Sequence, residues 1–237
     1  SYADITDYDA VSSMVNEVIQ HFGRIDILIN NAGILRDATF SKVSLDDFWK
    51  VIDVHLKGSV HCTKAVWDIM KQQNYGRIVF TSSASGLYGN FGQSNYAVAK
   101  SGLLGLMNVL DAEGKKYNIK VNLLAPSAHT RMTDELLTDA AKPLLSPDAI
   151  TPATLFLVSQ EAPSKTILAV GAGVYARTYM FETEGIFLPN SERTPENISQ
   201  NFEKISKIDQ PHFLNSASEQ TVRFIEKAMQ HQTKKAV

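Results

Sequence analysis

The sequence is poor in cysteine and contains no long apolar run. Cys62 is the only cysteine among 237 residues, so the chain cannot form an intrachain disulfide. A single cysteine is typical of a protein from a reducing compartment. No run approaches the 18 or more apolar residues of a membrane-spanning helix, so we expect no membrane span. The sequence therefore argues against a disulfide-rich scaffold and against a membrane protein.

The chain also lacks a strong charge of either sign. Its formal net charge is −2, with 23 basic and 25 acidic residues. Nucleic-acid-binding domains carry an excess of clustered basic residues, which this composition does not offer. We therefore expect no nucleic-acid partner, and we see no cluster that predicts a metal site.

What the chain does contain is enough apolar material for one sizeable core. Hydrophobic residues make up 44% of the sequence, which fits one large α/β domain, alone or with an appendage. Short apolar runs alternate with longer segments of helical periodicity. We predict the end of a strand over 1–5 and further strands near 25–29, 77–81, 119–125 and 167–170. Helices are predicted near 6–22, 45–71, 93–114 and 151–158. This alternation predicts a parallel sheet with helices on both faces.

The composition changes after about Gly185, where the chain becomes more polar. Thr194 with Pro195 predicts the start of one helix, and a second is predicted from about Ser218. We therefore divide the chain into a domain over 1–185 and a helical extension over 186–237, and we expect the extension to pack on the domain.

One stretch, 82–100, combines three residues that could perform proton chemistry. Tyr96 and Lys100 are four residues apart, so they share one face of a helix. An ammonium about 4 Å from a phenol is worth roughly 4 kcal/mol at an effective dielectric near 20, which could lower the pKa of the phenol by roughly 3. Ser83 lies at the end of the preceding strand, where its hydroxyl can face the helix. The alternative is a surface tyrosine beside a solvated lysine.

Two further segments are candidates for ligand contact. Asn30 to Gly33 is a turn of small residues after a predicted strand, where a ligand can approach the backbone. A plain turn is the alternative. The irregular segment from Ser127 to Leu145, with a short helical piece around 133–137, is a candidate lid.

With these motifs in order, the chain resembles the short-chain dehydrogenase/reductases from roughly Ala3 to Gly173. It is most similar to the (3R)-hydroxyacyl-CoA dehydrogenase units of peroxisomal multifunctional enzymes, through 31–37, 54–56 and 86–93. The resemblance implies a Rossmann-like, doubly wound parallel sheet with a C-terminal helical extension. It also implies hydride transfer between NAD(H) and a 3-hydroxy or 3-oxoacyl-CoA, with NADP as the alternative cofactor.

The resemblance assigns roles to individual residues. Tyr96 would be the general acid and base, and Ser83 would hydrogen-bond the reacting oxygen. Lys100 would lower the pKa of Tyr96 and bind the nicotinamide ribose. The other residues that the resemblance places at the cofactor are Asp4, Ile5, Asn31, Ala32, Gly33, Pro126 and Thr130.

The chain departs from the family pattern at three places. His55 stands where the family often has asparagine, so it is a candidate for the proton relay, although a structural histidine is the common alternative. Ser127 follows Pro126 where many members have glycine, and either Thr130 or Thr133 could reach the phosphates.

The third departure is the glycine-rich Thr-Gly-x-x-x-Gly-x-Gly turn, which the 237 residues do not contain. That turn supplies the backbone donors that hold a pyrophosphate. The resemblance starts at the family's third strand, so we expect the first two strands to be missing from this chain and the natural protein to be longer at its amino end. We expect these residues alone to bind nucleotide poorly, and the 25–29 strand to form a hydrophobic sheet edge.

Two other functions stay open from the sequence. The same enzyme class could act on a steroid, a sugar or an acyl-carrier-protein thioester. Alternatively, a chain without cofactor binding could serve as a scaffold. The resemblance further implies a homodimer or homotetramer, and a cytoplasmic location, or a peroxisomal one if the chain is part of a multifunctional enzyme.

Overall fold

The computed structural model describes residues 1–130, 133–134 and 137–235. It divides into two compact units, Ser1–Thr178 and Tyr179–Val237. The sequence places the change of composition slightly later, near Gly185. The packing of the extension on the domain stays a prediction.

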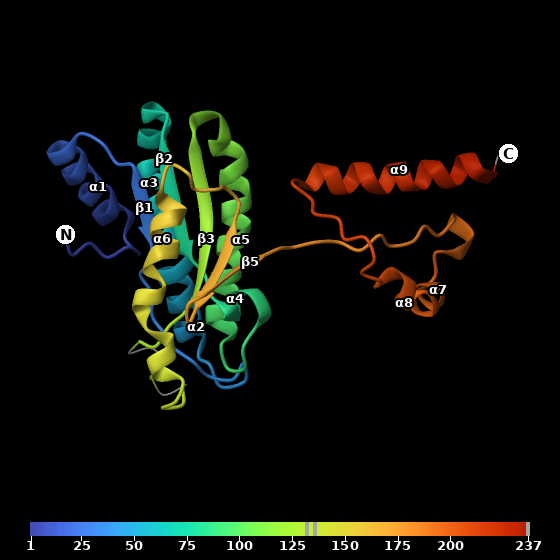
Figure 1. Ribbon diagram of the computed structural model, residues 1–237, viewed down its shortest axis with the longest axis horizontal. Coiled ribbons are helices and arrows are strands. Elements are labelled where there is room, and N and C mark those ends of the chain that lie inside the picture. The colour runs from blue at the N-terminus through green and yellow to red at the C-terminus, as the bar shows by residue number, and fades with distance from the viewer. Residues whose placement is uncertain (131–132, 135–136, 236–237) are drawn as a thin grey trace. The chain divides into compact units, whose positions relative to one another are not determined.

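The first unit is built on a five-stranded sheet (Figure 1). Its strands lie in chain order, and β1 to β4 are parallel, which confirms the predicted α/β class. The strands are β1 (Ile27–Asn30), β2 (Gly76–Thr81), β3 (Ile119–Ser127), β4 (Ile167–Gly171) and β5 (Val174–Thr178). The third strand runs past Pro126, where the sequence predicted its end. A proline at the end of a strand is tolerated because only its own ladder donor is lost.

The antiparallel strand β5 was not predicted. It forms a hairpin with β4 through the two residues Ala172 and Gly173, with Gly171 opposite Val174. Both turn residues have positive φ angles, 49° and 76°, as a type I′ turn requires. Alanine rarely adopts this conformation. Only the glycine of the Ala172-Gly173 pair therefore matches the residues that usually predict such a turn.

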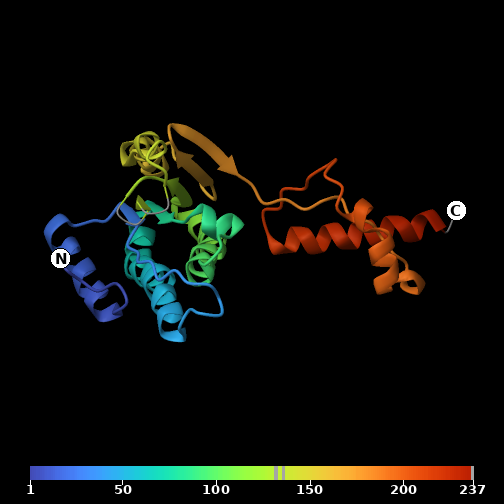
Figure 2. The same ribbon diagram turned by 90° about the horizontal axis from the view of Figure 1, so that it is seen from below.

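Helices cover both faces of the sheet. Figure 2 shows α6 on one side and α3 and α5 on the other. The helices among the described residues of this unit are α1 (Tyr8–Phe22), α2 (Leu45–Ile52), η1 (Asp53–Lys57), α3 (Gly58–Gln73), α4 (Ala84–Tyr88), α5 (Ser94–Gly114), η2 (Lys115–Tyr117), η4 (Lys142–Leu145), η5 (Pro147–Ala149) and α6 (Thr151–Val158). No helix in the described part of the chain is long and apolar enough to cross a membrane.

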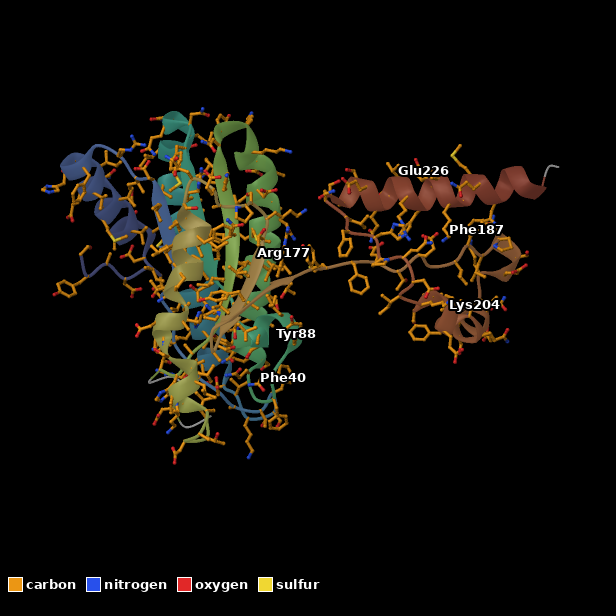
Figure 3. The ribbon with its side chains drawn as sticks, in the orientation of Figure 1. Phe40, Tyr88, Arg177, Phe187, Lys204 and Glu226 are labelled. Carbon is orange, nitrogen blue, oxygen red and sulfur yellow. The ribbon has the colours of Figure 1, made fainter. Side chains whose placement is uncertain are left out.

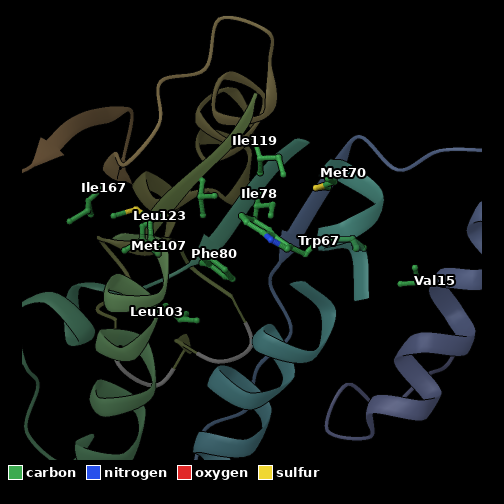
Figure 4. Packing of buried hydrophobic residues seen from close by; sticks show 12 residues of the cluster. Val15, Trp67, Met70, Ile78, Phe80, Leu103, Met107, Ile119, Leu123 and Ile167 are labelled. Carbon is green, nitrogen blue, oxygen red and sulfur yellow. The ribbon is translucent and has the colours of Figure 1, made fainter. Parts of the chain in front are cut away.

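The larger core lies between the sheet and helices α1, α3 and α5 (Figure 4). Ile78 and Phe80 of β2 point into it, while Val79 points into the smaller core under α6. Because both faces of β2 are covered, all six of its residues are buried. This is typical of a parallel strand. Packing on both faces therefore holds the carboxyl end of β2 in place.

The helix predicted over 45–71 is interrupted. A π-helical turn, η1, separates α2 from α3 and contains the buried His55. Such turns are rare and are frequent at functional sites. Helical periodicity alone does not reveal one, because the apolar residues continue through it.

Strand β1 forms one edge of the described sheet. Ile27 and Ile29 on this strand are 46% and 42% exposed. This is the hydrophobic sheet edge that the sequence predicted, and such edges favour pairing with another strand.

The predicted lid region carries ion pairs of its own. Asp134 lies 2.7 Å from His129 and 3.1 Å from Lys142, and hydrogen bonds from both hold the pKa of the Asp134 carboxyl below its usual range. The helical piece predicted over 133–137 includes 135 and 136, which lie outside the described residues.

The second unit contains the two predicted C-terminal helices, the first of them short. Its helices are η6 (Asn190–Glu192), α7 (Pro195–Gln200), α8 (Phe202–Ile205) and α9 (Ala217–Lys235). Glu184 joins the first segment of this unit to α9 through Lys227, at 2.5 Å, and Arg223, at 3.4 Å. Hydrogen bonds from Lys227 and His212 lower the pKa of Glu184 to about 2.

We predict that Leu103→Ala lowers the free energy of unfolding by about 2–5 kcal/mol, because Leu103 is fully buried in the larger core. Urea denaturation measures the difference. The matched control is Leu155→Ala, since Leu155 is 62% exposed and its loss should cost less than about 0.5 kcal/mol. Equal effects of the two variants would contradict this packing.

Candidate active site

Ser83, Tyr96 and Lys100 are placed by two helices, α4 and α5, that follow β2. Ser83 is the N-cap of α4, where its hydroxyl accepts a hydrogen bond from Ser85 N at 3.2 Å. Tyr96 and Lys100 lie on successive turns of α5. Helices α4 and α5 approach closely because residue 86 is glycine: a Cβ there would lie 2.5 Å from Lys100 Cβ. The short sequence between Ser83 and Lys100 thus folds back on itself.

These side chains line a cleft of about 500 Å³ at the carboxyl ends of β1, β2 and β3. In open parallel sheets, ligands bind at this edge. The predicted site residues that line this cleft are Asn31, Gly33, His55, Ser83, Tyr96, Lys100, Pro126 and Thr130. Thr133, the alternative to Thr130, lines it as well.

The pKa of Tyr96 does not shift in the predicted direction. Burial raises the pKa of the Tyr96 phenol above its ordinary value; a hydrogen bond with Ser83 opposes this, and the Asp37 charge adds to it. Lys100 is not among the groups that shift this pKa; its ammonium donates a hydrogen bond to the Thr81 carbonyl oxygen. Lys100 Nζ lies 5.5 Å from the centre of the Tyr96 ring.

Lys100 is itself a buried cation, with 3% of its surface exposed. Burial lowers its pKa to about 8, so the ammonium form still dominates at neutral pH. Among the described residues, Thr81 O is the one hydrogen-bond partner of Nζ. Two of its three N–H donors therefore remain for a ligand in the cleft.

His55 packs directly against Tyr96. The two rings are perpendicular, with centres 5.0 Å apart. His55 Nε2 lies 2.7 Å from Ile34 O and 3.0 Å from Ile34 N. Its Nδ1 is buried and has no hydrogen-bond partner among the described residues. Burial, aided by the Lys100 charge, lowers the pKa of His55 to about 4, so the ring is neutral at physiological pH.

Gly33 is required by this histidine. A Cβ at position 33 would lie 2.2 Å from His55 Cε1, far inside van der Waals contact. The small-residue turn after β1 therefore has a packing reason in addition to its place at the cleft.

Three predicted cofactor residues do not line the cleft: Asp4, Ile5 and Ala32. The 1–5 segment is not a strand, although the sequence predicted the end of one. Ile5 packs close to Gly58: a Cβ added at Gly58 would lie 2.6 Å from Cδ1 of Ile5. Asp4 accepts hydrogen bonds from Thr6, which hold the pKa of its carboxyl below the usual value.

Sequence reasoning missed a polar network on the wall of the cleft. Gln93 is 5% exposed; its Nε2 donates to Asp37 at 2.6 Å, and its Oε1 accepts from Ser85 at 2.7 Å and from Asn90 at 3.0 Å. This network joins the loop after β1 to α4 and to the start of α5. The signal that could have found it is the crowding of polar residues just before an apolar helix.

Comparison with known proteins agrees with this geometry. Residues 1–141 match the family model described as short chain dehydrogenase. The chain belongs to the short-chain dehydrogenase family. Members of this family use NAD(P).

Individual relatives are similar over most of the chain. The peroxisomal multifunctional enzyme type 2 of Mus musculus is 43% identical, over 92% of this chain and 30% of that protein. An acetoacetyl-CoA reductase of Acinetobacter is 38% identical, over 73% of this chain and 74% of that one. The solved full-length peroxisomal multifunctional enzyme type 2 from Drosophila melanogaster superposes with a TM-score of 0.81 at 33% identity, covering 95% of this chain and 40% of that one. The chain thus spans less than half the length of these multifunctional relatives.

We predict that acid weakens the fold through His55. Its pKa is about 4 in the folded chain and 6.5 ordinarily, so the unfolded chain binds the extra proton first, and stability falls as the pH drops from 6.5 to 4. Because each unit of difference between the two pKa values is worth 1.36 kcal/mol, the free energy of unfolding falls by about 3 kcal/mol. The measurement is urea denaturation at pH 7 and pH 4.5.

His55→Asn should remove most of this part of the pH dependence, because asparagine does not titrate. The control is His21→Asn on the exposed end of α1, which should leave the pH dependence as in the parent. An unchanged acid slope in His55→Asn would rule out His55 as its source.

We predict that Gly33→Ala destabilises the chain by about 1–3 kcal/mol, because the new methyl group collides with the His55 ring. Combining it with the smaller side chain of His55→Asn should recover part of the loss, since the two changes act on one contact. A double-mutant cycle from urea denaturation gives the coupling energy. Strict additivity would show that the contact is not the cause.

Proposed function

We propose that this protein transfers a hydride between NAD(H) and a 3-hydroxy or 3-oxoacyl-CoA. The observation that carries the proposal is the placement of Ser83, Tyr96 and Lys100 in one cleft. The substrate class is supported by relatives whose names refer to acyl-CoA chemistry, such as the acetoacetyl-CoA reductase.

In this proposal Tyr96 holds the proton that moves during the reaction. In reduction, the phenol donates its proton to the oxygen formed from the 3-oxo group; in oxidation, the hydroxyl proton passes back to Tyr96. Ser83 donates a second hydrogen bond to the same oxygen. Because burial raises the pKa of Tyr96, the phenol is protonated at neutral pH, which favours the donating role.

NAD(H), when bound, supplies or accepts the hydride at carbon 3 of the acyl chain. Two features of the cleft fit such a cofactor. Lys100 Nζ retains two N–H donors for the ribose hydroxyls, as described above. Thr81 donates a hydrogen bond to Asn31 Oδ1 at 3.1 Å, which holds the Asn31 side chain beside the cleft. We assign Asn31, Gly33, Lys100, Pro126 and Thr130 to the cofactor side, with Asp4, Ile5 and Ala32 farther along it. The cofactor of the proposal is NAD, with NADP as the alternative.

The neutral His55 ring is proposed as a further part of the proton path. Its buried Nδ1 has no partner among the described residues, so it could accept or donate a proton through a water molecule. This role is separate from its packing against Gly33.

We further propose that the protein self-associates through α3 and α5 and acts in peroxisomes. Val60 on α3 and Val98 and Val109 on α5 are 39%, 52% and 55% exposed, which leaves apolar surface for a second copy. The location is supported by the names of the multifunctional relatives.

The test of the proposed mechanism is Tyr96→Phe in the full-length natural protein. It should lower kcat by on the order of 10²–10⁴, because the proton donor is lost, while NAD+ affinity by isothermal titration stays within about twofold. Tyr117→Phe, far from the cleft in η2, is the matched control and should retain parental kcat. Near-parental turnover of Tyr96→Phe would refute the acid and base assignment.

The substrate class is tested by following NADH formation with a 3-hydroxyacyl-CoA, estradiol and, in the reverse direction, an acetoacetyl carrier protein. A preference for the CoA ester supports the proposal, and a preference for either other substrate replaces it. Failure of the parent to bind NAD+ or NADH would favour a scaffold role instead.

A further inference from the structure

A second hollow opens beside the candidate active site. It has a volume of about 270 Å³ and lies between α4 and the β4–β5 hairpin. It shares Ala84, Ser127 and Leu145 with the catalytic cleft, so the two spaces adjoin. Apart from Ser127 and the Tyr88 hydroxyl, its side chains are apolar.

The hollow exists because small side chains face it from three adjacent strands. Ala125 of β3 is opposite Ala169 of β4, and Ala169 is opposite Ala176 of β5. Ile167, two residues before Ala169, packs in the larger core, so this row lies on the sheet face that carries α4 and α5. Larger residues there would fill the space.

The far side of the hollow is closed by α4. Leu87 and Tyr88 of this helix line it, and Tyr88 Oη lies 3.4 Å from Thr178 Oγ1 on β5. Tyr88 is labelled in Figure 3. The result is an apolar groove that leads away from Ser83, between a helix on one side and a sheet on the other.

The catalytic cleft is polar on another wall, where Gln93, Asn90 and Ser85 lie. A ligand with one apolar end and one polar end would therefore be oriented in one direction. An acyl thioester has these two ends, on either side of carbon 3.

We propose that the groove between α4 and the β4–β5 hairpin binds the hydrocarbon tail of an acyl-thioester substrate, with the thioester toward the Gln93 wall. The inference rests on the proposed function and adds where the chain-length preference is set. A water molecule occupies about 30 Å³, so the groove of about 270 Å³ has room for several carbon atoms. The protein thus accepts medium-length chains, and Ala176 limits the space at the edge strand.

The experiment compares (3R)-3-hydroxydecanoyl-CoA with (3R)-3-hydroxybutanoyl-CoA in the full-length protein. Ala176→Leu adds three carbons to the groove from an exposed position. It should lower kcat/KM for the decanoyl ester on the order of tenfold to hundredfold, since each methylene denied its site costs about fourfold. The butanoyl ester, which does not reach the groove, should change less than about twofold. The control Leu155→Ala, at an exposed position of α6 outside the groove, should behave as the parent with both esters.

Ala169→Val, on the neighbouring strand β4, adds two carbons to the same groove. It should also lower kcat/KM for the decanoyl ester more than for the butanoyl ester, but by a smaller factor than Ala176→Leu. Thermal denaturation of each variant establishes that it folds. Equal losses for both esters, or unchanged preference in both groove variants, would overturn the proposal while leaving the proposed function in place. Altered association of the chain without altered chain-length preference would assign the groove to contact between copies. A parent without activity on either ester would instead refute the proposed function.

Discussion

The site depends on the hydrogen bond from the buried Lys100 ammonium to the carbonyl of Thr81. A cation in a protein interior is costly unless it is well paired, and here it is held by the end of a strand that is buried on both faces. The contact joins α5 to β2, and Gly86 permits α4 to lie against the same helix. Together these constraints bring Ser83, Tyr96 and Lys100 to one cleft.

One electrostatic inference from the sequence was wrong, namely that the pKa of Tyr96 is lowered. Spacing alone places Tyr96 and Lys100 on one face of a helix, and it does so correctly. It does not say where the ammonium points. In the fold, burial dominates the pKa of Tyr96 and raises it. The sequence pattern therefore identified the residues. Their pKa values depend on how deeply the fold buries them, which the pattern does not give.

Much of the first unit was predictable, since strands buried on both faces and amphipathic helices leave clear patterns. The α/β class and the parallel strands β1 to β4 follow from such patterns. The eight predicted site residues at the cleft came largely from the resemblance to the family. The hairpin strand β5 did not, because Ala172 replaces the usual glycine or asparagine in its turn. The network around Gln93 also escaped prediction, because its partners come from segments up to 56 residues apart.

The π-helical turn at 53–57 has a consequence for the phase of the helices on either side. Val51 before it and Met70 after it are both fully buried. In an uninterrupted α-helix, nineteen residues of about 100° each would rotate Met70 about 100° away from Val51. The wider turn absorbs one residue, so both side chains return to the same azimuth. A single-residue deletion inside the turn would keep this alignment and straighten the helix, whereas a deletion in α3 would turn its apolar stripe toward water.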